Sequence, residues 1–353
     1  MTEEVRDLVV AGSGVAGLSA AVYAARADLD PLVLEGDEPG GQLTLTTDVE
    51  NYLGFPEGVG GMELIQRGKE QAEQFGAEFQ HGSIESADLD GRPLSLSLST
   101  GETLRTRALI VATGASARWV GAEGEDELMG YGLSTCATCD GAFHRGDDVL
   151  VVGGGDSAME EALFLAKFAD SVTVVHRRDE LRASEIMADR ARDHEDVEFA
   201  WNTELVAIDG SREDGVTGAT LVSHPEGHPA EKYETGEGAN EADEALAVEE
   251  VDVGGVFYAI GHEPNTGFLR DTPVDLDDDG YVRTADAGEA WATTATAADG
   301  VFAAGDVMDR EYQQAVTAAG MGSMAALDVE EWLESEVAAP ADSTGSIATE
   351  ADD

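Results

Sequence analysis

The sequence has few basic residues, few cysteines and few aromatic side chains, and these shortages exclude several kinds of function. Of its 353 residues only 20 are lysine or arginine, against 73 aspartate or glutamate, and the formal net charge is −53. A chain with this charge repels nucleic acid. No apolar run approaches the roughly 18 residues that a membrane span needs, and the acidic start is unlike an export signal. We expect a cytoplasmic protein that binds neither nucleic acid nor membrane.

The acidic residues are scattered over the whole chain and not gathered in one tail. At low salt such charges destabilise the compact state, whereas at molar salt the Debye length falls to about 3 Å and screens them. The pattern favours a surface solvated for high salt over a docking site for a basic partner. We therefore predict a halophilic, archaeal source.

The only two cysteines, Cys136 and Cys139, are separated by two residues. In a cytoplasmic chain this spacing indicates redox chemistry or a metal site. A structural zinc site needs four protein ligands, but the chain has no second cysteine pair and His144 stands alone nearby. No metal is expected. The next residue, Asp140, is a candidate general acid and base, or a helix N-cap, and the two roles are compatible.

Length and glycine content predict two α/β domains. The chain suits about two domains of 100 to 200 residues, and its 42 glycines fit many tight turns between strands and helices. Residues 7–25 read as an apolar strand, a glycine turn and an alanine-rich helix, and residues 148–168 repeat that order. A second strand follows each unit, at 31–34 and 171–175. The chain thus begins two βαβ units about 140 residues apart.

Further buried strands are expected at 108–111, 255–260 and 301–306, followed by a helix over 313–334. A late return to the first fold suggests a discontinuous first domain with the second inserted in it. Two acidic stretches without periodicity, 225–250 and 336–353, are interpreted as a solvated loop and tail.

Both glycine turns carry the dinucleotide-binding pattern, but different side chains follow them. The first has Gly12, Gly14 and Gly17, with Glu35 at the end of the next strand to accept from ribose hydroxyls. The second has Gly153, Gly155 and Ala158, and its next strand ends in His176, Arg177 and Arg178, with Arg182 close behind. Guanidinium groups bind a 2′-phosphate, which favours NADPH over NADH.

Taken together, these features resemble the low-molecular-weight thioredoxin reductases of bacteria and archaea over residues 5 to 334. The matching segments are 40–43 (Gly-Gly-Gln-Leu), 50–56 (Glu-Asn-Tyr-Leu-Gly-Phe-Pro), 112–114 (Ala-Thr-Gly), 136–140 (Cys-Ala-Thr-Cys-Asp), 153–158 (Gly-Gly-Gly-Asp-Ser-Ala), 176–179 (His-Arg-Arg-Asp), 261–266 (Gly-His-Glu-Pro-Asn-Thr) and 305–307 (Gly-Asp-Val). The implied fold is two Rossmann-like domains, FAD-binding and NADPH-binding, with the NADPH domain inserted in the FAD domain. Expected boundaries are 1–116 and 248–335 for FAD, 117–247 for NADPH, and 336–353 for the tail.

The resemblance implies that Cys139 faces the flavin, that Cys136 attacks the substrate disulfide, and that Asp140 is the acid-base residue. In the expected FAD domain the candidate cofactor-binding residues are Gly12, Ser13, Gly14, Ala16, Gly17, Glu35, Gly41, Gln42, Leu43, Asn51, Thr113, Gly114, Gly261, Gly305, Asp306, Gln313, Gln314 and Ala315. In the expected NADPH domain they are Gly153, Gly155, Asp156, Ser157, Ala158, His176, Arg177, Arg178 and Arg182. The family also implies a homodimer, and a rotation of the small domain about linkers near 115–121 and 249–254.

Two departures from the family pattern stand out. Gln313 replaces an arginine common before the last helix, which leaves one FAD contact in doubt, and Ser323 replaces a cysteine. The predicted function is transfer of electrons from NADPH through FAD and the cysteine pair to thioredoxin. Alternatives are a flavoprotein of the same fold that serves a peroxidase or glutaredoxin-like carrier, and a non-catalytic flavin redox sensor. A ferredoxin:NADP reductase is disfavoured because it needs no cysteine pair.

Overall fold

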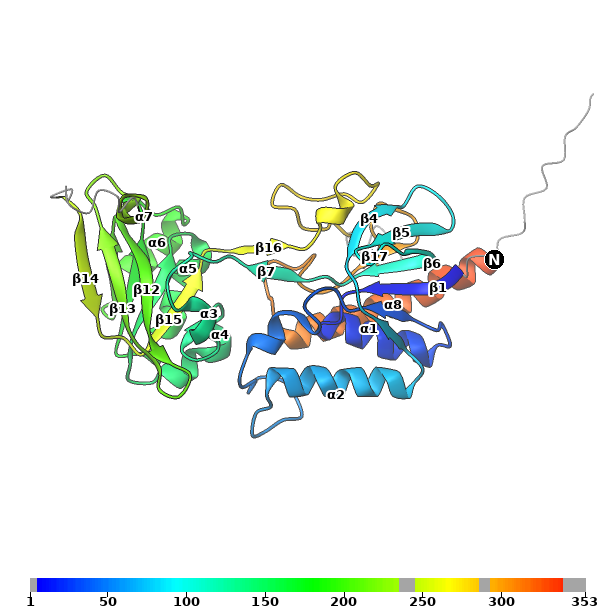
Figure 1. The fold of residues 1–353 in the computed structure, drawn as a ribbon, viewed down its shortest axis with the longest axis horizontal. Coiled ribbons are helices and arrows are strands. Elements are labelled where there is room, and N and C mark those ends of the chain that lie inside the picture. The colour runs from blue at the N-terminus through cyan, green and yellow to red at the C-terminus, as the bar shows by residue number, and fades with distance from the viewer. Residues whose placement is uncertain (1–4, 235–244, 286–292, 339–353) are drawn as a thin grey trace, which may run out of the picture. The chain divides into compact units, whose positions relative to one another are not determined.

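A computed structural model describes residues 5–234, 245–285 and 293–338 (Figure 1). The chain divides into two compact units. The first unit comprises Met1–Pro39, Gly68–Thr113 and Thr266–Asp353, and the second comprises Gly40–Arg67 and Gly114–Asn265. The first unit is therefore discontinuous.

A seven-stranded sheet forms the centre of the first unit. Strand β1 (Val5–Ala11) lies between β2 (Leu32–Leu34) and β6 (Thr103–Val111), and pairs with both in parallel. The later part of β6 also pairs in parallel with β17 (Val301–Ala303), while its earlier part pairs antiparallel with β5. The remaining elements of this unit are β3 (Glu78–Gln80), β4 (Ile84–Asp88), β5 (Leu94–Leu98) and η4 (Gly267–Leu269). Parallel strands end at one edge, where ligands bind in such sheets.

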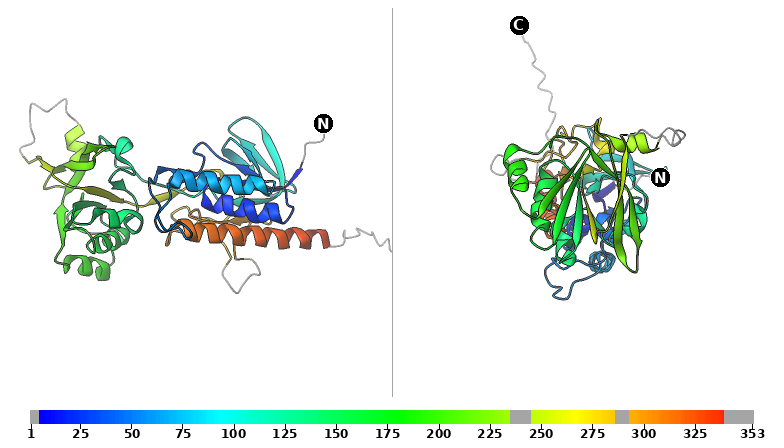
Figure 2. Two further views of the ribbon diagram at one scale, coloured as in Figure 1. Left: turned by 90° about the horizontal axis from the view of Figure 1, so that it is seen from below. Right: turned by 90° about the vertical axis from the view of Figure 1, so that its left-hand side faces the viewer.

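Helices α1 (Val15–Arg26), α8 (Ala315–Ala338) and the later part of α2 (Gly61–Gln74) cover one face of this sheet, and Figure 2 shows them side by side. Small residues on α1 and α8 let these two helices approach closely. A Cβ atom at Gly322 of α8 would lie 2.0 Å from the carbonyl oxygen of Ala16. The central strands are continuous apolar runs because both faces of the sheet are covered.

The second unit contains a five-stranded parallel sheet in the order β11-β10-β9-β15-β8, with β9 (Asp148–Gly153) at its centre. Helix α5 (Asp156–Leu165) packs on one face of it, and the antiparallel sheet β12-β13-β14 packs on the other. The other strands are β7 (Ala115–Ala117), β8 (Leu133–Ser134), β10 (Ser171–His176), β11 (Val197–Trp201), β12 (Thr203–Ser211), β13 (Gly215–Ser223), β14 (Ala247–Val251), β15 (Gly255–Ala259) and β16 (His262–Pro264). The other helices are η1 (Gly41–Leu45), α3 (Glu125–Leu128), α4 (Ala137–Asp140), η2 (Gly141–His144), α6 (Glu185–Arg192) and α7 (Pro229–Glu234).

The structure confirms both βαβ units and the final helix, which begins at Ala315 and continues to Ala338. The inserted domain ends later in the structure than the predicted residue 247, because β14 pairs with β13 and β15 pairs with β9. Residues 248–265 thus belong to the second unit, and the expected linker at 249–254 lies inside it. The chain passes between the units four times, at 39–40, 67–68, 113–114 and 265–266, so that 40–67, expected in the first domain, also belongs to the second unit. Beside the last two crossings, β7 and β16 pair antiparallel.

The stretch 225–250, expected to be an unstructured loop, contains α7 and β14. Strand β14 was missed because its residues are mostly exposed and acidic, and only pairing with β13 organises them. Residues 235–244 of this stretch, and 339–353 of the expected tail, lie outside the described residues. Residues 336–338 are the last turn of α8.

Candidate active site

The first glycine turn joins β1 to α1 in the first unit. Gly12 has φ +109°, and a Cβ atom there would lie 2.2 Å from the carbonyl oxygen of Ala112 at the end of β6. A Cβ atom at Gly17 would lie 1.9 Å from the oxygen of Gly12. Gly14 is the N-cap of α1, and no side chain caps this helix. The N-terminus of α1 therefore presents backbone N–H groups and the positive end of its dipole to an anionic ligand.

Glu35 lies directly after β2, beside this turn. Its backbone N–H donates to the oxygen of Gln80, and the hydroxyl of the buried Ser13 donates to the oxygen of Glu35 over 3.5 Å. The carboxylate of Glu35 accepts from Nζ of Lys69 on α2 at 2.7 Å, and this carboxylate side chain is only 15% exposed. Sequence reasoning placed Glu35 here but missed Lys69, since no local pattern joins a helix residue to a strand end 34 positions away.

Asp306 follows β17 and reaches the same region. Gly305, with φ +78°, packs against Ala16 so closely that a Cβ atom would lie 2.8 Å from the Cβ of Ala16. The Oδ1 atom of Asp306 is buried and has no hydrogen-bond partner among the described residues. Burial, and to a lesser extent Asp309, raises the pKa of Asp306 to about 6. A buried acceptor without a partner fits a ligand that brings hydroxyl donors, as a dinucleotide does.

The first unit therefore brings together Gly12, Ser13, Gly14, Ala16, Gly17, Glu35, Thr113, Gly305 and Asp306. At the start of α8, the oxygen of Gln314 accepts from Ala318 N–H and from the hydroxyl of Thr317, while Gln313 has φ +46°. The other predicted FAD-binding residues, namely Gly41, Gln42, Leu43, Asn51, Gly114 and Gly261, lie in the second unit.

The second glycine turn joins β9 to α5. A Cβ atom at Gly153 would lie 2.4 Å from the oxygen of Ala259, and Ala158 is fully buried beneath the turn. Gly155, the N-cap of α5, has φ −95° and no atom within 4 Å of an added Cβ. The space beside Gly155 is thus open to a ligand. Backbone N–H of Arg182 donates to the oxygen of Gly154 at 2.7 Å, which brings this arginine to the turn.

The predicted phosphate-binding cluster divides into a buried part and an exposed part. The ring of His176 is buried, since a Cβ atom at Gly154 would lie 2.2 Å from its Cε1, and its Nε2 lies 2.9 Å from the oxygen of Glu180. Burial lowers its pKa. His176 therefore supports the turn as a neutral ring.

Arg177 and Arg182 are exposed and Arg178 is half-buried. Burial, then the charges of Arg182 and Arg177, lower the pKa of Arg178. None of the three guanidinium groups forms an ion pair with a carboxylate in the described ranges. Three neighbouring guanidinium groups without carboxylate partners are chemically suited to binding a phosphate.

Asp156, also predicted to bind the cofactor, has partners within the protein. Its carboxylate accepts from both the backbone N–H and the hydroxyl of Ser184, at 2.8 and 2.7 Å, and these bonds lower its pKa. Asp156 thus ties the start of α5 to the start of α6. The neighbouring Ser157 is exposed on the first turn of α5.

Cys136 and Cys139 form a disulfide across the single turn of α4, with their Cα atoms 5.3 Å apart. The N–H groups of Cys139 and Asp140 both donate to the oxygen of Cys136 at 3.1 Å. Both cysteines are half-buried, whereas Thr138 between them is exposed. The disulfide thus closes a single hydrogen-bonded turn of the second unit.

Ser134 connects this turn to Asp140. Its Oγ accepts from Cys136 N–H at 3.0 Å and hydrogen-bonds the Asp140 side chain. Burial raises the pKa of Asp140, while Ser134 and His144 act in the opposite direction. A carboxyl group with a raised pKa beside the disulfide is suited to giving and taking a proton. The role predicted for Asp140 is therefore chemically reasonable, and Ser134 is a member of the site that sequence reasoning missed.

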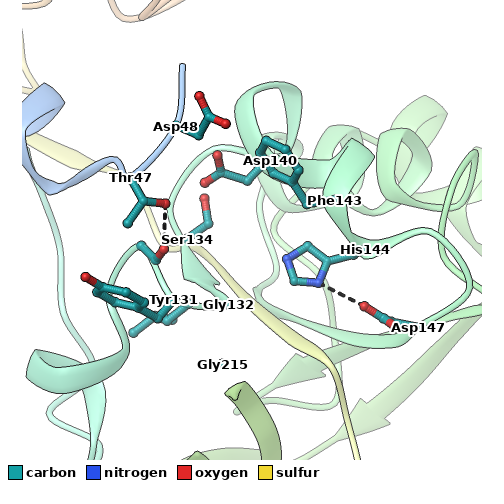
Figure 3. Close-up of a pocket in the computed structure, with 12 residues that line it drawn as sticks. Thr47, Asp48, Tyr131, Gly132, Ser134, Asp140, Phe143, His144, Asp147 and Gly215 are labelled. Carbon is teal, nitrogen blue, oxygen red and sulfur yellow. Dashed lines mark hydrogen bonds and ion pairs between the residues drawn. The ribbon is translucent and has the colours of Figure 1, made fainter. Parts of the chain in front are cut away.

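A cavity of about 280 Å³ lies in the second unit and is lined by Ser134, Asp140, Phe143 and His144 among others. Figure 3 shows these side chains around it. The ring of His144 packs against Phe257, and its Nδ1 lies 3.3 Å from the carboxylate of Asp147. Across the cavity, the hydroxyl of Thr47 donates to the oxygen of Gly130. His144 lies close enough to Asp140 for its charge to lower the pKa of that carboxyl group. No cluster of three metal-ligating side chains lies within the described ranges.

The family description "pyridine nucleotide-disulphide oxidoreductase" matches residues 6–322. The chain belongs to this family. It is similar to the thioredoxin reductase of Mycolicibacterium smegmatis, with 48% identity over 332 residues, which cover 94% of this chain and 98% of the relative. It is also similar to the thioredoxin reductase of Streptomyces clavuligerus, with 47% identity over 331 residues and 94% of each chain covered.

The chain is also similar to solved structures of thioredoxin reductases. Thioredoxin reductase from Giardia duodenalis matches with a TM-score of 0.82 and 37% identity, over 94% of this chain and all of that one. The enzyme from Streptococcus pyogenes matches with a TM-score of 0.82 and 36% identity, over 95% of this chain and all of that one. The α/β fold with two dinucleotide-binding units is thus the fold of this family. No helix in the described ranges is long and apolar enough to cross a bilayer.

Proposed function

We propose that this chain is a thioredoxin-disulfide reductase, which passes electrons from NADPH through FAD and the Cys136–Cys139 disulfide to oxidised thioredoxin. One observation carries the proposal: the disulfide lies in the same folded unit as a dinucleotide turn flanked by three arginines without carboxylate partners. Reduction of a disulfide by NADPH requires a hydride-donor site, a flavin that accepts the hydride, and a disulfide that accepts the electrons from the flavin. The thioredoxin reductases among its relatives support the choice of partner.

The first unit would hold FAD and the second NADPH. The turn at Gly12 and the N-terminus of α1 would take the FAD pyrophosphate, Glu35 would accept from a ribose, and the buried oxygen of Asp306 would accept from hydroxyls of the ligand. In the second unit, Arg177, Arg178 and Arg182 would bind the 2′-phosphate. When bound, NADPH supplies a hydride and FAD passes two electrons to the disulfide.

The chemistry on the protein is thiol–disulfide exchange. Two electrons and one proton convert the Cys136–Cys139 bond into a thiol and a thiolate, and Asp140 holds the proton that the leaving sulfur needs. The Cys136 thiolate then attacks the partner disulfide, forms a mixed disulfide and releases one partner thiolate. Cys139 loses its proton, attacks Cys136 and releases the second partner thiolate, which restores the original disulfide.

Four further expectations remain proposals. The halophilic source rests on the scattered acidic residues, and the cytoplasmic location rests on a sequence without an export signal or a long apolar run. The homodimer rests on the family resemblance, and the rotation of the second unit on the need of the disulfide to meet both flavin and partner. Of the four crossings between the units, those at 113–114 and 265–266 would be its hinges, because the strands next to them, β7 and β16, pair with each other. Sedimentation in molar KCl would measure the oligomeric state.

The test is NADPH oxidation by the flavin-loaded protein in molar KCl, with and without thioredoxin and a thiol-reactive dye. We expect thioredoxin-dependent turnover that Cys136→Ser and Cys139→Ser both abolish. Turnover that persists in Cys136→Ser would exclude the dithiol route. Turnover with a glutaredoxin-like or peroxidase carrier but not with thioredoxin would keep the mechanism and replace the partner.

A further inference from the structure

A buried carboxyl group lies under the redox-active turn. Glu161, on α5, accepts a hydrogen bond from the backbone N–H of Ala137, the residue that follows Cys136. Its Oε2 atom is inaccessible to solvent and has no hydrogen-bond partner among the described residues. Neither the dinucleotide site nor the exchange chemistry described above uses this group.

The packing around Glu161 holds it in place. Ala137 is 1% exposed and belongs to the same core cluster as the buried face of α5. Gly141, at the end of the redox-active turn, packs so closely on α5 that a Cβ atom there would lie 3.1 Å from Leu165 Cδ2. The Glu161 carboxyl group therefore lies close to the peptide unit that joins Cys136 to Ala137, in a region of low polarity.

We propose that Glu161 is a positioning residue of the disulfide-reducing site, which couples proton uptake at a buried carboxyl group to the reduction of Cys136–Cys139. The inference deepens the proposed function, because it concerns the same disulfide. Its balance is simple: the disulfide takes two electrons from the reduced flavin and one proton to give a thiol and a thiolate. Where Glu161 is ionised, its carboxylate takes up one further proton from solvent.

The direction of the coupling follows from electrostatics. Burial, and then the neighbouring charge of Glu160, raise the pKa of Glu161 to about 8, while the Ala137 bond acts against them. Reduction adds a negative charge on sulfur close by, and a like charge disfavours a carboxylate. The pKa of Glu161 is therefore higher in the dithiol state than in the disulfide state, and reduction becomes harder as the pH rises through this range.

Other titratable groups lie on α5 and on the elements that pack against it. The elements packed against α5, and α5 itself, carry Cys136, Cys139, Asp140, His144, Asp148, His176, Tyr258, Glu185, Asp189, Arg190, Arg192, Asp156 and Glu160. Of these, Glu160 is the group whose charge acts on Glu161 in the disulfide state. Glu160 is exposed, so Glu160→Gln is a matched control one position away.

The experiment measures the dithiol–disulfide equilibrium of Cys136–Cys139 in flavin-loaded protein. Wild type, Glu161→Gln and Glu160→Gln are equilibrated with reduced and oxidised dithiothreitol in molar KCl from pH 6 to 9.5, then alkylated and weighed by mass spectrometry. The dithiothreitol contribution is the same for all three and cancels. The readout needs neither thioredoxin nor NADPH turnover, so failure of the proposed partner leaves it unaffected.

We expect the reduction constant of Glu161→Gln, divided by that of wild type, to rise from about 1 near pH 6 to about 10 above pH 9, because one pKa unit of coupling is a tenfold change. Glu160→Gln should show no such rise. A ratio for Glu161→Gln that stays constant over this range would overturn the proposal. Glu161→Met removes the hydrogen-bond acceptor as well, and the same constant shift in both variants would assign Glu161 to packing alone.

A second measurement needs no Glu161 variant. Redox difference infrared spectra of wild type and of Asp140→Asn at pH 8.5 should both gain a protonated carboxyl band on reduction. If the band is missing from both spectra, or depends on Asp140, Glu161 does not take up the proton.

Discussion

At the first glycine turn a Cβ atom on Gly12 would lie 2.2 Å from the oxygen of Ala112, and at the second a Cβ atom on Gly153 would lie 2.4 Å from the oxygen of Ala259. In both places the first glycine of the pattern packs against the end of the neighbouring parallel strand. The side chains that follow differ. Glu35 pairs with Lys69 at the first turn, whereas Arg177, Arg178 and Arg182 at the second have no carboxylate partner in the described ranges.

The comparison separates two requirements of a dinucleotide site. Backbone approach depends on the glycines and is the same in both units, because only a residue without Cβ fits against a strand-end carbonyl oxygen. The choice of ligand depends on charge at the end of the second strand, where a carboxylate accepts from ribose hydroxyls and guanidinium groups bind phosphate. Four predictions test this division, from the largest expected effect to the smallest.

The largest loss of stability is expected at Gly12, where neighbouring backbone leaves no room for a Cβ atom. Gly12→Ala puts a Cβ against the oxygen of Ala112 at φ +109°, and such overpacking and strain cost about 3 kcal/mol or more of unfolding free energy. Gly155→Ala, at φ −95° with open space, should change it by less than about 0.5 kcal/mol and raise the KM for NADPH. Denaturant unfolding, followed by flavin absorbance, measures the unfolding free energy of both variants. Equal destabilisation by the two variants would contradict a purely steric role for Gly12.

The second prediction concerns the charge at the second turn. Arg178→Gln should lower kcat/KM for NADPH about 10- to 100-fold, since a hydrogen bond to a charged group contributes about 1.5–3 kcal/mol. The value for NADH should stay unchanged. Arg190→Gln, an exposed charge on α6, is the control and should affect neither. An equal loss with both nucleotides would show that Arg178 does not read the 2′-phosphate.

The third prediction concerns Asp306 of the first unit. Its folded pKa, about 6, lies above the ordinary value of 3.8, so the folded state binds the proton more tightly. Stability of the flavin-free protein should therefore fall as the pH rises from 4 to 6, by on the order of 2 kcal/mol after allowance for partial exposure. Asp306→Asn should remove this slope, stabilise the flavin-free protein at pH 8 and weaken flavin retention. An unchanged slope in unfolding experiments would exclude Asp306 as its source.

The smallest effect is expected at Glu35. Glu35→Gln loses the ion pair with Lys69, which at partial exposure contributes about 1 kcal/mol or less, and flavin dissociation should rise by no more than about 10-fold. Glu78→Gln removes the ion pair with Arg6 in the same sheet and serves as the control. It should lower stability similarly without changing flavin release. If Glu78→Gln releases flavin as fast, Glu35 acts through stability only.

Much of the fold could be predicted from local pattern. The apolar strands at Leu8–Val10 and Val149–Val152, their glycine turns and the alanine-rich helices after them appear where the sequence placed them. Each of these features depends on neighbours within about 20 residues. The final helix was predicted for the same reason, although it ends four residues later than expected, at Ala338.

The features that the sequence did not predict depend on contacts between residues far apart in the chain. The end of the second unit was placed too early because β14 has an exposed acidic sequence and is a strand only through its pairing with β13. His176 shares the basic sequence of its neighbours, but contact with Gly154 buries its ring. The contacts between Lys69 and Glu35, and between Glu161 and Ala137, join residues with no common motif.

The sequence by itself determined two dinucleotide turns, a pair of cysteines two residues apart and an acidic surface, because each is a property of residue type and short spacing. The tertiary structure alone decided which side chains are buried, and burial governs their chemistry here. Removal from water raises the pKa of Asp140, Glu161 and Asp306 and lowers that of His176. No spacing in the chain reveals these shifts, since each depends on residues that only folding brings into contact.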